Sequence, residues 1–337
     1  MSFKILLLFE FGVPSYRKYV LDWLNCRTGS VVSIISANDK FRSLRLKNEH
    51  RLNFFIGKGE NRLYLFNPLR LIDKNVVIST FNLRRPHTWL FLLILPWKKW
   101  IFWGQAEWTS SNLLINFLRR ILLSLSSGYI AYTPKGKKNL IDFGYPERKI
   151  SVAFNTLDVP NHRLTIGGEY LLYFGRLQER KKIELIFPYL RELGLKMRIV
   201  GDGDYKASLV EMTVEQGVEN LVEFYAGTYN NDEILEHFSS SACYFSPGHV
   251  GLGVVQAFAY GVPVFTLSSC SHAPEFAYCN DENSYLFNNF NDMVQSLEKL
   301  DFDSTEHSKK KSSAYEYYQN NLSIENVYKA FEYHLRD

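Results

Sequence analysis

SPGHVGLGVVQAFAYGVPVF, residues 246–265, holds a glycine-bearing loop and a helix between two strands. The short apolar run 242–245 in front of it is typical of a buried strand. Val255 and Phe258 then fall at helical spacing, and Gly261 with Pro263 ends the helix. Glycines let a backbone approach a ligand, and free N–H groups at a helix start attract anions. The stretch predicts an anion site, with an ordinary strand-loop-helix crossover as the alternative.

Length and composition describe a globular chain of two domains. The 337 residues are 46% apolar, enough for two cores of about 150 residues each. The four cysteines have no CxxC spacing, which disfavours zinc and disulfide frameworks and indicates a reducing, cytoplasmic compartment. The apolar run that starts the chain is short, so we interpret it as a buried strand rather than a signal peptide.

The charge is divided unevenly between the two halves. Residues 1–150 hold 24 Lys+Arg and 9 Asp+Glu, a balance of +15, whereas the remainder holds 15 and 26, a balance of −11. A basic half suits an anionic partner such as nucleic acid, lipid headgroups or a phosphorylated substrate, although a merely solvated basic face gives the same count.

Both halves alternate strands and helices. Strand-like runs in the first half are 3–9, 31–36, 75–80, 100–104 and 129–133. In the second half a strand near 170–174 precedes a helix over 182–193, and further strands and helices follow up to two terminal helices over 304–320 and 323–336. This order predicts two doubly wound α/β domains, whose ligands lie beyond the carboxyl ends of the strands.

The polar segment 158–169 has the composition of a linker. We therefore predict an N-terminal domain over 1–160, completed by the helix 323–336, and a C-terminal domain over 161–322. Residues 41–72 have no regular pattern.

Two apolar segments of the first half allow two interpretations. TWLFLLILPW (88–97) is too short to span a bilayer, which takes about twenty residues. Tryptophans and lysines follow it, as at a membrane interface, but burial in the core explains it as well. NLLINFLRRILLSLSS (112–127) predicts an amphipathic helix that can pack on the core on one side and contact lipid on the other.

Three motifs of the second half are expected to border one crevice. FGRLQERKK (174–182) supplies Gly175, Arg176 and Lys181; VGDGD (200–204) supplies Gly201; the third is 246–265. Each follows a predicted strand, so all should meet at one edge of the sheet. An arginine fork, a lysine and glycine backbone suit a diphosphate.

In this order the motifs resemble the retaining glycosyltransferases of family 4, which have the GT-B fold. The resemblance rests on FNTLD, FGRLQERKK, VGDGD, residues 246–265 and HAPEF (272–276), and covers 150–290 well and the first half loosely. It implies two Rossmann-like domains that face a central cleft, with Arg176 and Lys181 holding the donor's diphosphate. It also implies that the Gly251 and Leu252 amides bind the distal phosphate.

The resemblance assigns further donor contacts. Asn155 falls where the family's chain enters the cleft, and Gly12 corresponds to its first glycine loop. The remaining expected donor-binding positions are Gly175, Gly201, His249, His272 and Glu275, where a local capping role for His272 and Glu275 is an alternative.

Two positions depart from the family pattern. The usual Glu-x7-Glu is replaced by Gly248 and Gln256. A glutamine can still hydrogen-bond ribose hydroxyls, but Gly248 has no side chain for the sugar. A branch of bacterial polysaccharide transferases has a PGxVGL loop like this one, which favours altered sugar recognition over lost activity.

In the first half, Gln105 stands where many members of the family have histidine. Glutamine cannot act as a general base. This fits a front-face mechanism in which the departing phosphate oxygen takes the acceptor's proton. Glu107 is the nearest carboxylate and either orients the acceptor hydroxyl or is structural.

The sequence thus predicts a cytoplasmic glycosyltransferase that moves a sugar, with retention, from a nucleotide-diphosphate donor, UDP being favoured. The expected acceptor is a glycan, lipid-diphosphate-linked, at the inner face of the membrane, as in O-antigen or capsule synthesis. No cofactor or metal is expected, since Arg176 and Lys181 can balance the diphosphate charge. Alternatives are a nucleotide-sugar epimerase of this fold, a non-catalytic sugar-binding partner of a synthase complex, and a nucleic-acid-binding protein, for which no motif is present.

Overall fold

The computed structural model describes residues 4–9, 15–28, 33–37, 49–52, 55–56, 63–64, 73–83, 86–108, 112–160, 162–165 and 167–336. The chain divides into two compact units. Unit 1 is Met1–Phe154 with Ile324–Asp337, and unit 2 is Asn155–Ser323. The final helix, which the sequence assigned to the first domain, lies in unit 1. The division falls six residues before the predicted boundary, because Thr156 Oγ1 donates to the Leu322 carbonyl at 2.5 Å inside unit 2.

Unit 1 is built on a parallel sheet. Its described strands run in the order β3-β2-β1-β6-β7-β8-β9, and β4 pairs antiparallel with β5. The strands are β1 (Ile5–Phe9), β2 (Ser33–Ala37), β3 (Glu49–Leu52), β4 (Phe55–Ile56), β5 (Leu63–Tyr64), β6 (Val76–Ser79), β7 (Lys99–Gly104), β8 (Gly128–Ala131) and β9 (Ile150–Val152). The helices are α1 (Lys18–Thr28), α3 (Pro86–Ile94), α4 (Leu113–Ser124), α5 (Pro134–Asp142) and α12 (Ile324–Leu335), with 3₁₀ turns Ser15–Arg17 and Glu147–Lys149.

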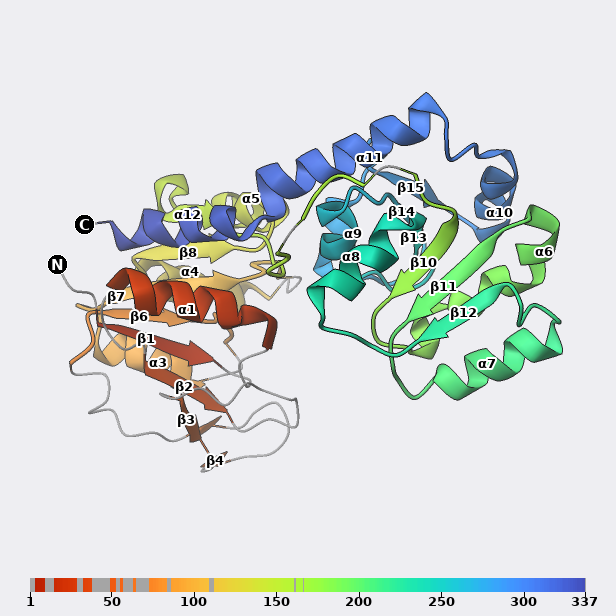
Figure 1. Ribbon diagram of the computed structural model, residues 1–337. Coiled ribbons are helices and arrows are strands. Elements are labelled where there is room, and N and C mark those ends of the chain that lie inside the picture. Colours follow the sequence, from red (N-terminus) through yellow and green to blue (C-terminus); the bar gives the residue numbers. More distant parts are fainter. Residues whose placement is uncertain are drawn as a thin grey trace. The chain divides into compact units, whose positions relative to one another are not determined.

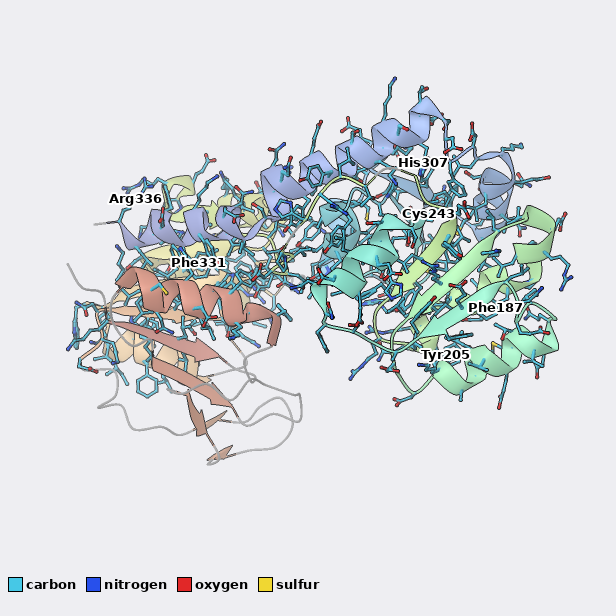
Figure 2. The ribbon with its side chains drawn as sticks, in the orientation of Figure 1. Phe187, Tyr205, Cys243, His307, Phe331 and Arg336 are labelled. Atoms are coloured by element: carbon cyan, nitrogen blue, oxygen red, sulfur yellow. The ribbon has the colours of Figure 1, made fainter. Side chains whose placement is uncertain are left out.

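Helices cover both faces of this sheet, which explains why its central strands β1 and β6 are almost entirely apolar. In one core, α1 and α12 lie side by side on the sheet, and Phe331 of α12 packs on Trp23 and Trp103 (Figures 1 and 2). In the other, Leu92 of α3 and Leu122 of α4 pack against the opposite face. The strands that the sequence predicted in the first half are β1, β2, β6, β7 and β8.

Unit 2 has a second parallel sheet, whose described strands run in the order β12-β11-β10-β13-β14-β15. Its strands are β10 (Tyr170–Phe174), β11 (Lys196–Val200), β12 (Val222–Tyr225), β13 (Ser241–Phe245), β14 (Val264–Leu267) and β15 (Ser284–Phe287). Its α-helices are α6 (Leu190–Leu193), α7 (Lys206–Glu215), α8 (Asn231–Ser239), α9 (Gly253–Ala259), α10 (Phe290–Lys299) and α11 (Thr305–Tyr317). Shorter turns are Glu179–Lys181, Ile183–Tyr189, Pro274–Tyr278 and Tyr318–Leu322.

The predicted helix over 182–193 is present, but most of it is 3₁₀ rather than α. After the 3₁₀ turn Glu179–Lys181, the segment forms the 3₁₀ helix Ile183–Tyr189, followed by the four-residue α6. Lys182 has a left-handed φ of 54°, which separates the two 3₁₀ turns. Pro188 lies inside the second one and lacks the N–H that an α-helix needs. This irregular path brings the 179–182 turn back over the sheet edge.

Candidate active site

The three predicted motifs of unit 2 lie at one edge of its sheet. Arg176 follows β10, Gly201 follows β11, and residues 246–252 follow β13. Both β11 and β13 pair with β10, so the three strand ends are neighbours. Because these strands are parallel neighbours, the loops that follow them lie together at one edge of the sheet, as the sequence predicted.

The loops after β10 and β11 are joined through backbone groups. The Gly175 N–H donates to Val200 at 2.9 Å, and the Leu177 N–H donates to Asp202 at 3.1 Å. A Cβ on Gly201 would overlap the Gly175 carbonyl oxygen. Glycine is therefore required at 201 so that the two loops can approach each other closely. We expect Gly201 to contribute to donor binding by keeping the two loops in this arrangement.

The loop of residues 246–252 packs under the turn that carries Lys181. The N–H groups of Gly248 and His249 donate to the carbonyls of Lys181 and Arg180, both at 3.0 Å. In return Lys181 Nζ donates to the His249 carbonyl at 2.6 Å. A Cβ on Gly248 would overlap this backbone. The Gly248 N–H is therefore already bonded within the protein and is not available to a donor.

The charge of Lys181 is controlled by its surroundings. Its pKa is lowered to about 8, chiefly by burial and also by repulsion from Arg180, while the carboxylate of Glu275 opposes both effects. Arg176, by contrast, is exposed, and its guanidinium has no hydrogen bond or ion pair within the described residues. This edge of the sheet thus has one lysine whose charge depends on its surroundings and one exposed arginine that is available to bind a phosphate.

Glu275 is buried, with 5% of its surface exposed, in the turn Pro274–Tyr278. Its carboxylate accepts a hydrogen bond from Asn155 Nδ2 at 2.5 Å. The Asn155 carbonyl in turn accepts one from Tyr278 Oη at 3.0 Å. The structure brings these two predicted residues together beside Lys181.

His272 connects two loops. Its Nδ1 accepts from the Val250 N–H at 3.1 Å and its Nε2 lies 2.7 Å from the Leu267 carbonyl, so the ring is neutral and donates through Nε2. Burial lowers its pKa, and the ring stacks on Phe276 at 4.0 Å. Both nitrogens are occupied in this arrangement, which makes His272 a positioning residue for the loop.

Three expected donor contacts remain open to a ligand. No described group accepts a hydrogen bond from the N–H of Gly251 or Leu252, and a Cβ on Gly251 would meet nothing within 4 Å. The half-buried Gln256 on α9 likewise has no hydrogen bond to its side chain within the described residues. The segments that meet at this edge of the sheet thus carry the free N–H groups of Gly251 and Leu252, the side-chain amide of Gln256, and two cations.

The expected residues of unit 1 form a separate group. Gln105 is exposed after β7, and Glu107 accepts from Thr133 Oγ1 at 3.1 Å and pairs with Lys135 Nζ at 3.3 Å. Thr133 caps α5, so Glu107 braces the start of that helix. Gly12 lies outside the described residues.

Sequence reasoning missed two cations. Arg180 supports the Lys181 turn through its carbonyl and lowers the Lys181 pKa; its place in an RKK run was the available signal. Arg17 of unit 1 is buried, bonds the Tyr132 hydroxyl and lies 4.2 Å from the Trp103 ring centre. Nothing local in the sequence marks this stacking. Within the described residues no cluster of His, Cys, Asp or Glu could hold a metal ion.

Comparison with known proteins agrees with this geometry. Residues 158–317 match the family described as glycosyl transferases, group 1. The chain has the GT-B fold. Solved structures that share it include HepE of Anabaena in complex with UDP (TM-score 0.69, 14% identity, 98% of each chain covered). The lipopolysaccharide outer core galactosyltransferase WaaB (0.65, 14%, 98% of this chain and 99% of that one) is another.

A pneumococcal O-GlcNAc transferase, GtfA, in complex with UDP and GlcNAc also shares the GT-B fold (0.67, 10%, 100% of each chain). No curated protein sequence matches the chain. The solved structures confirm the predicted fold class. The matched family model covers residues of unit 2, where the three motifs lie. No helix among the described residues is long and apolar enough to span a membrane.

Proposed function

We propose that this GT-B protein transfers a sugar from a nucleoside-diphosphate donor, with UDP as the nucleotide, to a glycan acceptor with retention of configuration. The observation that carries the proposal is the pair Arg176 and Lys181 at one sheet edge, with Lys181 held beside Glu275. A diphosphate would neutralise both cations, and the partly buried Lys181 would gain most because its charge is poorly solvated.

In the proposed reaction, the bond between the sugar's anomeric carbon and the β-phosphate oxygen breaks. A bond from the acceptor oxygen to that carbon forms, and the acceptor's proton passes to the departing phosphate oxygen. Arg176, Lys181 and the amides of Gly251 and Leu252 stabilise the charge of the leaving diphosphate. Gln256 hydrogen-bonds the ribose. These residues supply charge and orientation, and no general base or metal ion is needed.

The choice of donor draws support from the solved relatives. Anabaena HepE has been solved with UDP and with UDP-glucose, and the pneumococcal O-GlcNAc transferase with UDP. Each shares the fold over nearly the whole chain. A uridine donor at the sheet edge of unit 2 that carries Arg176 and Lys181 is therefore our first choice.

For the acceptor we propose a lipid-diphosphate-linked glycan at the cytoplasmic membrane face, in surface polysaccharide synthesis. The +15 balance of residues 1–150 supports an anionic acceptor in unit 1. Gln105, exposed after β7, would contact it, and Glu107 would orient its hydroxyl through the network that already fixes the carboxylate.

The test is a calorimetric titration of UDP, GDP, ADP and their sugars into the full chain. We expect one nucleoside diphosphate to bind, and Arg176→Ala and Lys181→Ala each to weaken it by about tenfold to a hundredfold. Lys196→Ala is the matched control, since Lys196 is exposed at the opposite, amino end of β11. If the two site variants bound the nucleoside diphosphate as tightly as the Lys196→Ala control, the proposed donor site would be wrong. Radiolabel transfer to extracted lipid-linked glycans then tests the reaction.

One observation favours a second candidate, a non-catalytic sugar-binding partner. Gly248 packs on the Lys181 turn and has no side chain to contact a donor sugar. Tight nucleotide-sugar binding with neither transfer nor donor hydrolysis would select this alternative.

A further inference from the structure

The outer face of α4 is apolar. Leu122 and Leu123 pack on the sheet, whereas five large apolar residues on the other side are exposed. They form two rows along the helix, Leu113, Phe117 and Ile121 in one and Leu114 and Leu118 in the next. Residues four apart lie on one face, so these rows make one continuous strip.

The neighbouring α3 continues this surface. Its Leu92 is buried in the same core as Leu122, which places both helices on one side of the sheet. Leu93 and Ile94 of α3 are exposed, and Trp97 after it is 74% exposed. We name the exposed apolar side chains of α3, Trp97 and α4 the α3–α4 face. Contiguous apolar surface of this kind is uncommon on a soluble monomer unless something covers it.

Positive charge borders the α3–α4 face. Neither helix contains an acidic residue, and α4 itself carries Arg119 and Arg120, of which Arg120 is exposed. Arg120 projects beside the first row, with its guanidinium 5.2 Å from the Phe143 ring centre.

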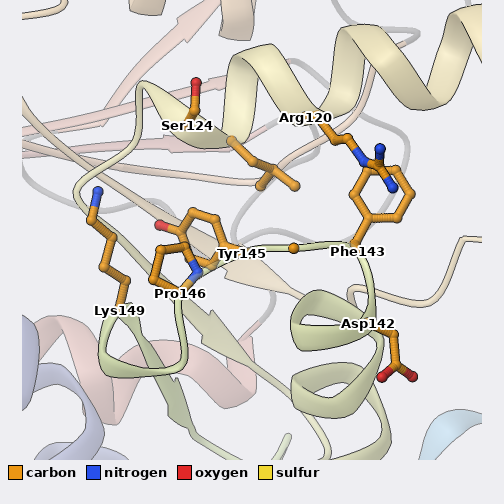
Figure 3. Close-up of a pocket in the computed structure, with 9 residues that line it drawn as sticks. Arg120, Ser124, Asp142, Phe143, Tyr145, Pro146 and Lys149 are labelled. Atoms are coloured by element: carbon orange, nitrogen blue, oxygen red, sulfur yellow. The ribbon is translucent and has the colours of Figure 1, made fainter.

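Arg120 also lines a pocket of about 550 Å³ next to α4, together with Tyr145 and Lys149 (Figure 3). Lys149 Nζ donates to the Ser126 carbonyl at 3.0 Å. Asp142 is at the rim, and its carboxylate points away from the Arg120 guanidinium in Figure 3. Arg120 and Lys149 lie on opposite sides of Tyr145 in Figure 3, so each can meet the phosphate of a different lipid whose acyl chains lie against the α3–α4 face.

We propose that the α3–α4 face docks on an anionic lipid bilayer, with its apolar side chains at the acyl boundary and Arg120 and Lys149 among the phosphates. An apolar strip with a basic border is typical of helices that lie in a membrane interface. Neither helix is long enough to span: α3 has 9 residues and α4 has 12. The inference goes beyond the proposed reaction, because docking requires no donor and no turnover.

The experiment is flotation of the full chain with vesicles made of equal parts phosphatidylglycerol and phosphatidylcholine, or of phosphatidylcholine alone. We expect flotation with the anionic vesicles and its loss at high salt. Leu114→Ser with Phe117→Ser should lower the partition coefficient by about tenfold or more. Arg120→Ser should lower it by about fivefold. The matched controls are Val214→Ser and Tyr229→Ser, which remove exposed apolar side chains of unit 2 and should change nothing.

A second measurement does not depend on altering α4. Bromine-labelled acyl chains quench the fluorescence of tryptophans that enter the bilayer, so Trp97→Phe should remove the quenched fraction. Flotation that is equal for both vesicles, or unchanged in the α4 variant, would overturn the proposal. So would a concentration-dependent dimer that the α4 variant abolishes while wild type fails to float, since a second copy would then cover the face. Nucleotide titration of the same variants separates this outcome from failure of the donor site.

Discussion

Asn155 Nδ2 donates a hydrogen bond of 2.5 Å to the carboxylate of Glu275, a residue 120 positions further along the chain. This contact fixes a buried negative charge close enough to Lys181 to raise the lysine's pKa against the effect of burial. The first residue of unit 2 is thereby linked to the charge state of the proposed diphosphate site.

Asn155→Ala should destabilise unit 2. Removing the amide leaves a buried carboxylate without this partner, which costs about 1–3 kcal/mol of unfolding free energy. Urea unfolding measures the loss. Adding Glu275→Gln should recover part of it, because an unpaired neutral amide is less costly than an unpaired charge. Identical losses in the single and double variants would contradict the pairing.

Nucleotide affinity should fall at alkaline pH. Burial depresses the Lys181 pKa to about 8 in the free protein, so the ammonium is charged below that pH and deprotonates above it. We expect the Kd of UDP to be flat near neutrality and to rise above pH 8, by up to about tenfold per pH unit. Calorimetry across this range gives the profile.

Two variants test the assignment of that profile to Lys181. Lys181→Arg keeps its charge, so its profile should be flat. Glu275→Gln removes the charge that raises the Lys181 pKa, so the decline should begin at lower pH. A wild-type profile in both would assign the titration elsewhere.

Gly248→Glu, which introduces the glutamate of the family pattern that the sequence resembles, should weaken nucleotide binding rather than improve it. Any side chain at 248 overlaps the backbone of Arg180 and Lys181 and displaces the lysine. Gly251→Ala is the control, since its Cβ would enter open space. UDP titration and thermal unfolding distinguish the two, and a Gly248→Glu protein with wild-type stability would refute the packing argument.

Chelation should leave nucleotide binding unchanged. The proposal assigns the diphosphate charge to Arg176 and Lys181, so UDP titration with excess EDTA and with added Mg²⁺ should give the same Kd. A Kd that rises by about tenfold or more on chelation would require a metal ion at the site.

Acid should destabilise each unit through one buried histidine. Burial lowers the pKa of His307 in unit 2 and of His334 in unit 1 from 6.5 to about 4 (Figure 2 labels His307). The unfolded chain therefore binds more protons between about pH 6.5 and 4, and unfolding free energy falls over this window by up to about 3 kcal/mol per residue. Urea unfolding at several pH values measures this loss, and His307→Gln should reduce it for unit 2 alone.

The positions of β1, β6, β10 and β13 were predictable because continuous apolar runs mark strands buried on both faces, whereas β3, β4 and β5 lie in residues 41–72, where the sequence has no regular pattern. The parallel order of β10, β11 and β13 followed from their alternation with helices, and the convergence of Gly175, Gly201 and the 246–252 loop followed from that order. The 182–193 segment is helical as predicted, but its 3₁₀ form and the break at Lys182 were not predicted, because nothing in a lysine side chain indicates a left-handed backbone.

By itself, the sequence determined two α/β domains and the edge of the second where two cations and the glycine loops meet. Only the tertiary structure decided what each residue does there. It paired Asn155 with Glu275, engaged both nitrogens of His272, and packed Gly248 against the turn that carries Lys181. Periodicity reports which face of an element is buried, whereas these contacts depend on how loops far apart in the chain fit against each other.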